Sequence, residues 1–304
     1  MKKFFLINHD SENSRLDRWF KINICNVPQS LIEKNIRKGN IKINYRRKKS
    51  SYKLKKGDKV ILFNINFEQR SNKKKLFYYK ASKKDLSSSK SMFIENNENF
   101  AIINKPAGIS VQAGTKSRRN IVDILRHTKE FSDTKPFVVH RIDKETTGIL
   151  VIAKNRNYAQ LFTSLFRIRR MHKTYLGIVI GNFEKNTGTY TDYLYHYEGD
   201  RKVKSKAVTH YKVLDSNNHY SLLRLNPITG RKHQLRKQLL MHGHPILGDQ
   251  KYRLIDKNFN KKDFLMLHAF KIDFSINNHK YNFTADLPEI FKKNLNEKYL
   301  KISL

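Results

Sequence analysis

Residues 140–148 read HRIDKETTG, and the apolar run ILVIAK follows at once at residues 149–154. The apolar run predicts a buried β-strand entered through Gly148. The Asp143 carboxylate therefore lies among basic and hydroxyl side chains just before a buried strand, where it has no packing role. A carboxylate has a use there if it is held ionised and directed at a nucleic acid. We predict that Asp143 is a catalytic residue.

The chain is strongly basic. Among its 304 residues, 62 are Lys or Arg and 26 are Asp or Glu, so the formal net charge is +36. A surface of this charge attracts polyanions, because neutralising phosphates releases counterions and drives binding without sequence readout. The chain is also rich in Lys, Asn and Ile, as in AT-rich genomes, so compositional drift is a second explanation of the Lys excess. The charge favours nucleic acid as the partner.

Several classes of site are excluded by what the sequence lacks. The single cysteine, Cys25, excludes an internal disulfide and every multi-cysteine metal motif. A chain without disulfides fits a reducing compartment. No two of the 12 glycines are separated by one residue, and no phosphate-binding loop or nucleophile elbow occurs. His233, His242 and His244 are close in sequence, but no carboxylate or second ligand pair stands at zinc spacing. We predict neither a metal site nor a cofactor.

The N-terminus shows no targeting pattern. Its apolar run, residues 4–7, is cut short by Asn8, His9 and Asp10, and no small-residue cleavage pattern follows. No apolar stretch approaches the length needed to cross a bilayer. We therefore predict a cytoplasmic protein, acting as a monomer without membrane contact.

The apolar patterning divides the chain into four parts. Residues 1–12 are expected to form an N-terminal strand and extension, and residues 13–63 a small α/β module with a basic edge. Residues 64–95, rich in Lys and Ser, predict a basic linker that includes one strand near residues 76–79. Residues 96–304 form the last and largest domain.

Strands dominate the last domain. Because they follow one another with few intervening helices, we predict an α+β fold with a largely antiparallel mixed sheet and helices packed on it. The expected strands span residues 1–7, 41–44, 60–63, 100–104, 137–140, 148–154, 174–180, 206–213, 219–225 and 264–273, and the expected helices span residues 16–22, 28–38, 158–170 and 232–242.

Three further segments complete a motif set with residues 140–148. They read NKPAG at 104–108, RMHKTY at 170–175 and TGRKHQLR at 229–236. In this order the four segments resemble the RluA-type family of pseudouridine synthases, over about residues 98–275. The N-terminal module resembles an S4 RNA-binding domain. Features near residues 28–39 and 112–114 look most like the RluC type, which acts on large-subunit ribosomal RNA.

The resemblance implies an isomerisation of uridine to pseudouridine in RNA, without a cofactor. Asp143 would act at the sugar or base; attack on C1′, attack on C6 and charge stabilisation all stay open. Arg236 would pair with Asp143 and keep it ionised. Tyr175 would lie against the base, and its hydroxyl is a candidate for taking the C5 proton. Arg141 would enter the space that the flipped base vacates.

The remaining predicted site residues concern RNA binding. His140 is interpreted as positioning the loop rather than acting as a base, and Lys105 as contacting phosphate. Lys173 belongs to a basic cluster, residues 167–173, that we interpret as a phosphate track. The other predicted RNA-binding residues are Arg231 in the last motif and Arg46 and Arg47 in the N-terminal module. Lys237 and Gln238 depart from the family pattern, which is expected to alter the rim of the RNA groove.

Two alternatives compete with the ribosomal RNA enzyme. The first is a synthase of the same family that acts on transfer RNA, which the S4-like module disfavours because it points to structured ribosomal RNA. The second is a non-catalytic RNA-binding assembly factor, in which the positive surface does all the work. Asp143, Tyr175 and Arg236 at motif positions speak against a protein that only binds.

Overall fold

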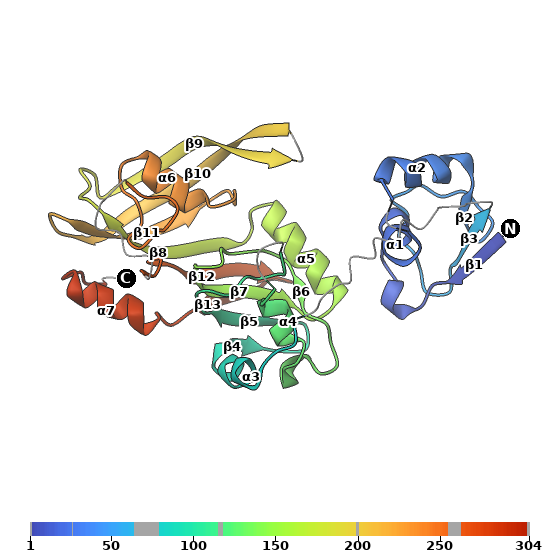
Figure 1. The fold of residues 1–304 in the computed structure, drawn as a ribbon, viewed down its shortest axis with the longest axis horizontal. Helices are drawn as coiled ribbons and strands as arrows, with labels where there is room; N and C mark the ends of the chain where they lie inside the picture. Colours follow the sequence, from blue (N-terminus) through green and yellow to red (C-terminus); the bar gives the residue numbers. More distant parts are fainter. Residues whose placement is uncertain are drawn as a thin grey trace. The chain divides into compact units, whose positions relative to one another are not determined.

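We describe a computed structural model of the chain, covering residues 2–25, 27–63, 79–114, 118–198, 201–254 and 263–302. The chain divides into two compact units, Met1–Leu76 and Phe77–Leu304. Each unit is described by itself (Figure 1). Within the described residues, no helix combines the length and the apolarity needed to cross a membrane.

The first unit pairs two helices with a three-stranded antiparallel sheet. Helix α1 spans Leu16–Asn23 and α2 spans Gln29–Lys38, and the strands β1 (Lys2–Leu6), β3 (Lys59–Phe63) and β2 (Ile41–Ile43) pair in that order. Buried residues of both helices and of the sheet share one apolar core. The predicted helices and strands of this unit are confirmed. Because β1 pairs with β3, residues 2–12 are part of this unit and not a separate extension.

The predicted linker is folded over its described part. Residues 79–95 belong to the second unit and contain helix α3 (Lys83–Ser89), the 3-10 turn η2 (Lys90–Met92) and the start of β4 (Phe93–Asn96). Ser82 and Asp85 cap α3 reciprocally, and Asp85 also accepts hydrogen bonds from Tyr79 and Arg119. The Lys- and Ser-rich composition suggested a tether, but this buried carboxylate fixes the segment. The predicted strand near 76–79 lies largely outside the described residues.

The second unit is built on a ten-stranded sheet. Its main path runs β4-β5-β7-β12-β8-β11-β10-β9, while β13 pairs with β12 and β6 with β7. Every pairing is antiparallel except that of β7 with β12. The remaining strands are β5 (Phe100–Lys105), β6 (Phe137–Val138), β7 (Thr147–Ala153), β8 (His172–Ile180), β9 (Thr187–Glu198), β10 (Arg201–Ser216), β11 (Tyr220–Pro227), β12 (Leu267–Ile276) and β13 (His279–Thr284). The predicted mixed, largely antiparallel α+β fold is confirmed.

Helices cover this sheet where apolar stripes face it. In α5 (Arg156–Arg167), Phe162 is fully buried, and Tyr158, Leu161 and Leu165 pack on the same core, as the helical spacing predicts. The sequence prediction missed the strands β4, β9 and β13 and the helices at Lys83–Ser89, Ile121–Leu125 and Glu289–Glu297. The other helices are α4 (Ile121–Leu125), α6 (Gln234–Met241) and α7 (Glu289–Glu297), with a 3-10 turn η3 at Lys129–Phe131.

Strand β7 is buried on both faces, which explains its continuous apolar run. All seven of its residues are buried; Leu150 and Ile152 belong to one core cluster, and Ile149 and Val151 to another. Alternate residues of a strand point to opposite faces, so an apolar face is needed on each side.

The parallel joint between β7 and β12 requires glycine at position 148. Only two residue pairs form this joint, His268 with Thr147 and Ala269 with Gly148. Gly148 has φ +102°, and a Cβ atom there would lie 2.2 Å from the Ala269 carbonyl oxygen. The last glycine of HRIDKETTG therefore permits the strand that follows the Asp143 loop to join the rest of the sheet.

Candidate active site

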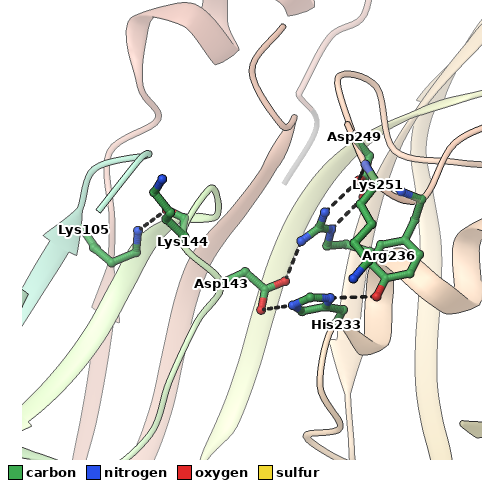
Figure 2. Close-up of polar contacts among 8 residues, drawn as sticks. Lys105, Asp143, Lys144, His233, Arg236, Asp249 and Lys251 are labelled. Atoms are coloured by element: carbon green, nitrogen blue, oxygen red, sulfur yellow. Dashed lines mark hydrogen bonds and ion pairs between the residues drawn. The ribbon is translucent and has the colours of Figure 1, made fainter. Parts of the chain in front are cut away.

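Asp143 lies in the loop between β6 and β7, at a cleft of about 570 Å³ in the second unit. Its side chain is 25% exposed, so one part faces the cleft while the rest is enclosed. Arg236 on α6 donates from Nη1 to Asp143 Oδ2 at 3.1 Å (Figure 2). The pairing that the resemblance implies is therefore present, and it joins groups 93 residues apart in the chain.

A second carboxylate fixes Arg236. Asp249 accepts from Arg236 Nε and Nη2, both at 2.7 Å, and its side chain is fully buried. Oδ1 of Asp249 also accepts from the backbone N–H groups of Lys251 and Tyr252. The guanidinium thus presents two donors to Asp249 and turns one toward Asp143, as Figure 2 shows. The bidentate pair sets the direction in which Arg236 meets Asp143.

Asp249 is held by a turn that also requires glycine. Gly248 has φ +76°, and a Cβ atom at this position would lie 1.9 Å from the Phe264 carbonyl oxygen. The backbone at position 248 therefore passes too close to residue 264 for a side chain. Sequence reasoning missed Asp249. The available signal was a carboxylate directly after the apolar residues 245–247 and Gly248.

The surroundings of Arg236 keep its guanidinium protonated. Burial by itself lowers its pKa, but the hydrogen bonds and negative charges of Asp249 and Asp143 raise the pKa further above its ordinary value. Arg236 therefore stays cationic at every pH at which the protein is folded, and it gives Asp143 a permanent positive neighbour.

His233 faces the other oxygen of Asp143. Its Nε2 lies 3.7 Å from Asp143 Oδ1, and its Nδ1 lies 2.8 Å from the Tyr252 hydroxyl. Burial lowers the pKa of His233 from 6.5, although the charge of Asp143 opposes the shift. The ring is therefore mainly neutral at neutral pH, and its contact with Asp143 is polar rather than a full ion pair. The sequence analysis considered His233 only as a metal ligand and rejected that role, so the contact of His233 with Asp143 was not predicted.

Tyr175 on β8 lines the same cleft. Burial, and then the charge of Asp143, raise the pKa of its phenol well above the ordinary 10. The hydroxyl therefore stays protonated around neutral pH, which favours hydrogen-bond donation and ring packing over action as an ionised base.

Comparison with known proteins identifies the family. A family model for RNA pseudouridylate synthase matches residues 99–241. The chain is 32% identical to "Ribosomal large subunit pseudouridine synthase C" of Buchnera aphidicola subsp. Baizongia pistaciae (strain Bp), over 95% of each chain. The chain belongs to the RNA pseudouridylate synthase family.

Other members agree with this assignment. The protein of the same name from Rickettsia conorii (strain ATCC VR-613 / Malish 7) is 32% identical over 93% of this chain and 97% of its own. Among solved structures, "Human RNA Pseudouridylate Synthase Domain Containing 4" superposes with a TM-score of 0.61 at 27% identity, covering 72% of this chain and 98% of that one. The family's catalytic fold is thus the fold of the second unit.

His140 holds the Asp143 loop against β7. Its Nε2 accepts from the backbone N–H of Val151 at 2.8 Å, and its ring stacks on Phe166 with centroids 4.5 Å apart. Burial lowers the pKa of His140 to about 3, so the ring stays neutral. These contacts suit a positioning role and leave no charge for a phosphate.

The sequence predicted that Lys105 contacts phosphate, but the structure buries this side chain among backbone carbonyls. The residue is fully buried, and its Nζ donates to the carbonyl oxygens of Pro106, Ile109 and Lys144 at 2.7, 3.0 and 3.0 Å. Three carbonyls satisfy the three donors of an ammonium, so the side chain ties β5 to the residue after Asp143 (Figure 2). The Lys-Pro motif is therefore structural in this chain.

Burial lowers the pKa of Lys105 from 10.5 to about 7. The unfolded chain binds this proton up to higher pH than the folded chain, so stability rises with pH between about 7 and 10.5, by up to about 1.4 kcal/mol per pH unit. We expect wild type to gain stability relative to Lys105→Met across this window, as measured by urea unfolding followed by circular dichroism at pH 6, 7, 8 and 9. A difference that is constant with pH would contradict the shift.

Basic side chains form the rim of the cleft. Arg141, Lys173 and Arg231 all line it, and Arg141 and Arg231 are exposed. Arg167 and Arg169 of the predicted phosphate track line it as well. Burial lowers the pKa of Lys173 to about 8, so at neutral pH it remains mostly charged. The rim is therefore positive where a polyanion would enter.

The remaining predicted RNA-binding residues belong to the first unit. Arg46 and Arg47 are exposed in the first unit, and Arg47 lines a groove there with Arg37, Lys48 and Lys49. Of the two residues that depart from the family pattern, Gln238 is fully buried and donates to Asp192, so its side chain lies in the core and not at the rim. Across the described ranges, no group of three or more His, Cys, Asp or Glu side chains is placed to hold a metal ion.

Proposed function

We propose that this chain isomerises specific uridines of large-subunit ribosomal RNA to pseudouridine. The proposal rests on the placement of Asp143. Its carboxylate is held by Arg236 at a cleft that Tyr175 lines, and basic side chains surround this cleft. In the reaction the N1–C1′ bond breaks, a C5–C1′ bond forms, the C5 proton leaves and N1 gains a proton. Nothing is oxidised or reduced, so the chemistry needs no cofactor.

In this proposal Asp143 is the catalytic carboxylate. Arg236 holds its Oδ2, while Oδ1 lies on the side of His233. Attack on C1′, attack on C6 and stabilisation of a cationic sugar all require an ionised carboxylate in contact with the nucleotide. One carboxylate suffices, because no water has to be activated as in glycoside hydrolysis.

The target base has to leave its stack to reach Asp143. Flipping costs a few kcal/mol, which contacts in the complex must offset. We assign this task to Arg141, because it is exposed, lines the cleft and stands two residues before Asp143. A guanidinium plane can fill the vacated space and contact phosphates at the same time. Lys173 and Arg231 are assigned to the flanking phosphates.

The ribosomal RNA target rests on the relatives and on the first unit. The relatives with about a third identity are named for the large ribosomal subunit, and they match almost the whole chain, including its first unit. We propose that this first unit is an S4-type RNA-binding domain in which Arg46 and Arg47 contact RNA. We further propose that the protein acts as a cytoplasmic monomer.

Release of tritium tests this function. The purified protein is incubated with large-subunit RNA that carries tritium at uracil C5, and release into water is followed. Release from this RNA and not from transfer RNA supports the proposal. Release from transfer RNA alone would show that the chain is a synthase of the same family that acts on transfer RNA. Tight binding without release from either RNA, or from assembly-intermediate particles, would favour the binding factor.

Replacement of Tyr175 tests the role of its ring. Because the raised pKa keeps the phenol neutral, Tyr175→Phe is expected to lower kcat by less than about tenfold. Tyr175→Ala removes the surface against which the base packs and is expected to cost at least about a hundredfold. Single-turnover rates of both variants, measured from pH 6 to 9, check this. A Phe variant as slow as the Ala variant would make the hydroxyl the proton acceptor.

A further inference from the structure

Strands β9 and β10 form a long ribbon at one edge of the sheet (Figure 1). Their register places Tyr193 opposite Lys206 and Tyr195 opposite Lys204. Residues directly opposite in an antiparallel pair share a face, and alternate residues of one strand do so too. Tyr193, Tyr195, Lys202, Lys204 and Lys206 therefore lie on one face, which we call the ribbon face.

The aromatic rings of the ribbon face are open to solvent. Tyr193 is 54% exposed and Tyr195 is 50% exposed, which is unusual for two large rings side by side. Lysine ammonium groups lie over both rings: Lys204 Nζ lies 4.6 Å from the Tyr193 ring centre, and Lys202 Nζ lies 4.4 Å from that of Tyr195. The face thus alternates rings and positive charges.

The other face of the ribbon is packed, so the ribbon face is presented on a firm support. Leu194 and Ala207 are buried there, and Gln238 of α6 donates to Asp192. The one described carboxylate of β9, Asp192, is therefore on the packed side, since it pairs with Ala207. In the part of the ribbon with described side chains, 187–195 and 202–212, the ribbon face carries no acidic residue.

Two basic side chains connect the ribbon to the catalytic cleft. Arg231, which lines the cleft, donates from Nε to the carbonyl oxygen of Lys206 at 3.1 Å. Lys237, the residue after Arg236, donates from Nζ to the carbonyl oxygen of Tyr195 at 3.2 Å. Positive charge therefore continues from the rim of the cleft to the strands that carry the ribbon face.

We propose that the ribbon face binds a single-stranded segment of the RNA substrate, with bases stacked on Tyr193 and Tyr195 and phosphates held by Lys202, Lys204 and Lys206. An unpaired strand offers both base faces for rings and phosphates for cations, and stacking on aromatic rings is open to every base. When a base stacks on one of these rings, it displaces the lysine ammonium group that lay there. The displaced ammonium group can then pair with the phosphate of the same nucleotide. A duplex offers no free base faces, so it gains only the charge contacts.

This inference takes the identity of the RNA from the proposed function, but RNA binding by the ribbon face can be tested without measuring activity. The affinity of the full chain for a fluorescent 12-nucleotide oligouridine and for a 12-base-pair RNA duplex is measured by anisotropy at several salt concentrations. The variants are Tyr193→Ala/Tyr195→Ala, the ring-preserving Tyr193→Phe/Tyr195→Phe, and Lys202→Gln/Lys204→Gln. Tyr299→Ala, at an 88% exposed tyrosine outside the ribbon, is the matched control.

We expect the Ala pair to weaken binding of the single strand by at least about tenfold and to leave duplex binding unchanged, while the Phe pair and Tyr299→Ala bind like wild type. The Gln pair should reduce the slope of log affinity against log salt by about two. Wild-type affinity of the Ala pair for the single strand would overturn the proposal. Ribbon-dependent binding without any tritium release from wild type would instead refute the proposed function alone.

Discussion

Replacing Asp143 by asparagine will reduce tritium release from ribosomal RNA by at least about a thousandfold and leave the fold and RNA affinity nearly unchanged. The neutral amide can neither attack the nucleotide nor stabilise positive charge on it. Arg236 keeps its bidentate contact with Asp249 in this variant, so no buried charge loses its main partner. Single-turnover tritium release and anisotropy binding, measured on the same preparation, check both parts.

Glu145→Gln is the matched control. It also removes one negative charge two residues away, but the Glu145 side chain is 46% exposed and contacts Lys144 rather than Arg236. Release by this variant should stay within about threefold of wild type, since an exposed ion pair contributes little. If Asp143→Asn retained more than a tenth of wild-type release, Asp143 would not be the catalytic group.

Replacing Asp249 by asparagine will destabilise the second unit by about 3–5 kcal/mol and also abolish activity. The amide turns donors toward Arg236 or toward the backbone N–H groups of Lys251 and Tyr252, so a buried cation loses its main partner. Arg236 then loses the contact that directs it to Asp143. Urea unfolding followed by circular dichroism measures the loss.

The chain supplies an internal reference for this experiment. Its only tryptophan, Trp19, lies in the core of the first unit, so tryptophan fluorescence should report an unchanged transition there. The double variant Asp249→Asn/Arg236→Met removes the stranded charge and should recover part of the stability without activity. Equal stability of Asp249→Asn and wild type would show that Asp249 does not anchor Arg236.

The sequence predicted those strands and helices whose pattern of apolar residues follows from burial alone. Strand β7 is apolar throughout because both its faces are buried, and α5 shows a clean helical stripe because one face packs on the core. Strand β9 was missed because its outer face carries exposed Thr and Tyr while its inner face mixes Leu194 with Asp192. Its polar composition follows from its position at the sheet edge, which the sequence alone does not reveal.

The candidate site shows the same division. Asp143 and Arg236 stand in segments that resemble the motifs of the family, and this resemblance implied that they pair. Asp249 has no motif in the sequence, and its importance appears only when the guanidinium is seen between two carboxylates. Lys105 was assigned to phosphate because a lysine in a basic chain is expected at the surface. Three backbone carbonyls, one of them 39 residues away, reversed that expectation.

The two-pair joint between β7 and β12 divides the sheet into two halves, and the site draws on both. Asp143 enters with β7, whereas Tyr175 and Arg236 come with the strands and helix on the far side of the joint. A chain with only one half folded would still attract RNA through its charge. Its Asp143 would lack the contact with Arg236, however, so it would leave uridines unaltered. Activity therefore requires that the β7–β12 joint has formed, so the rate of isomerisation reports whether both halves of the sheet are correctly folded against each other.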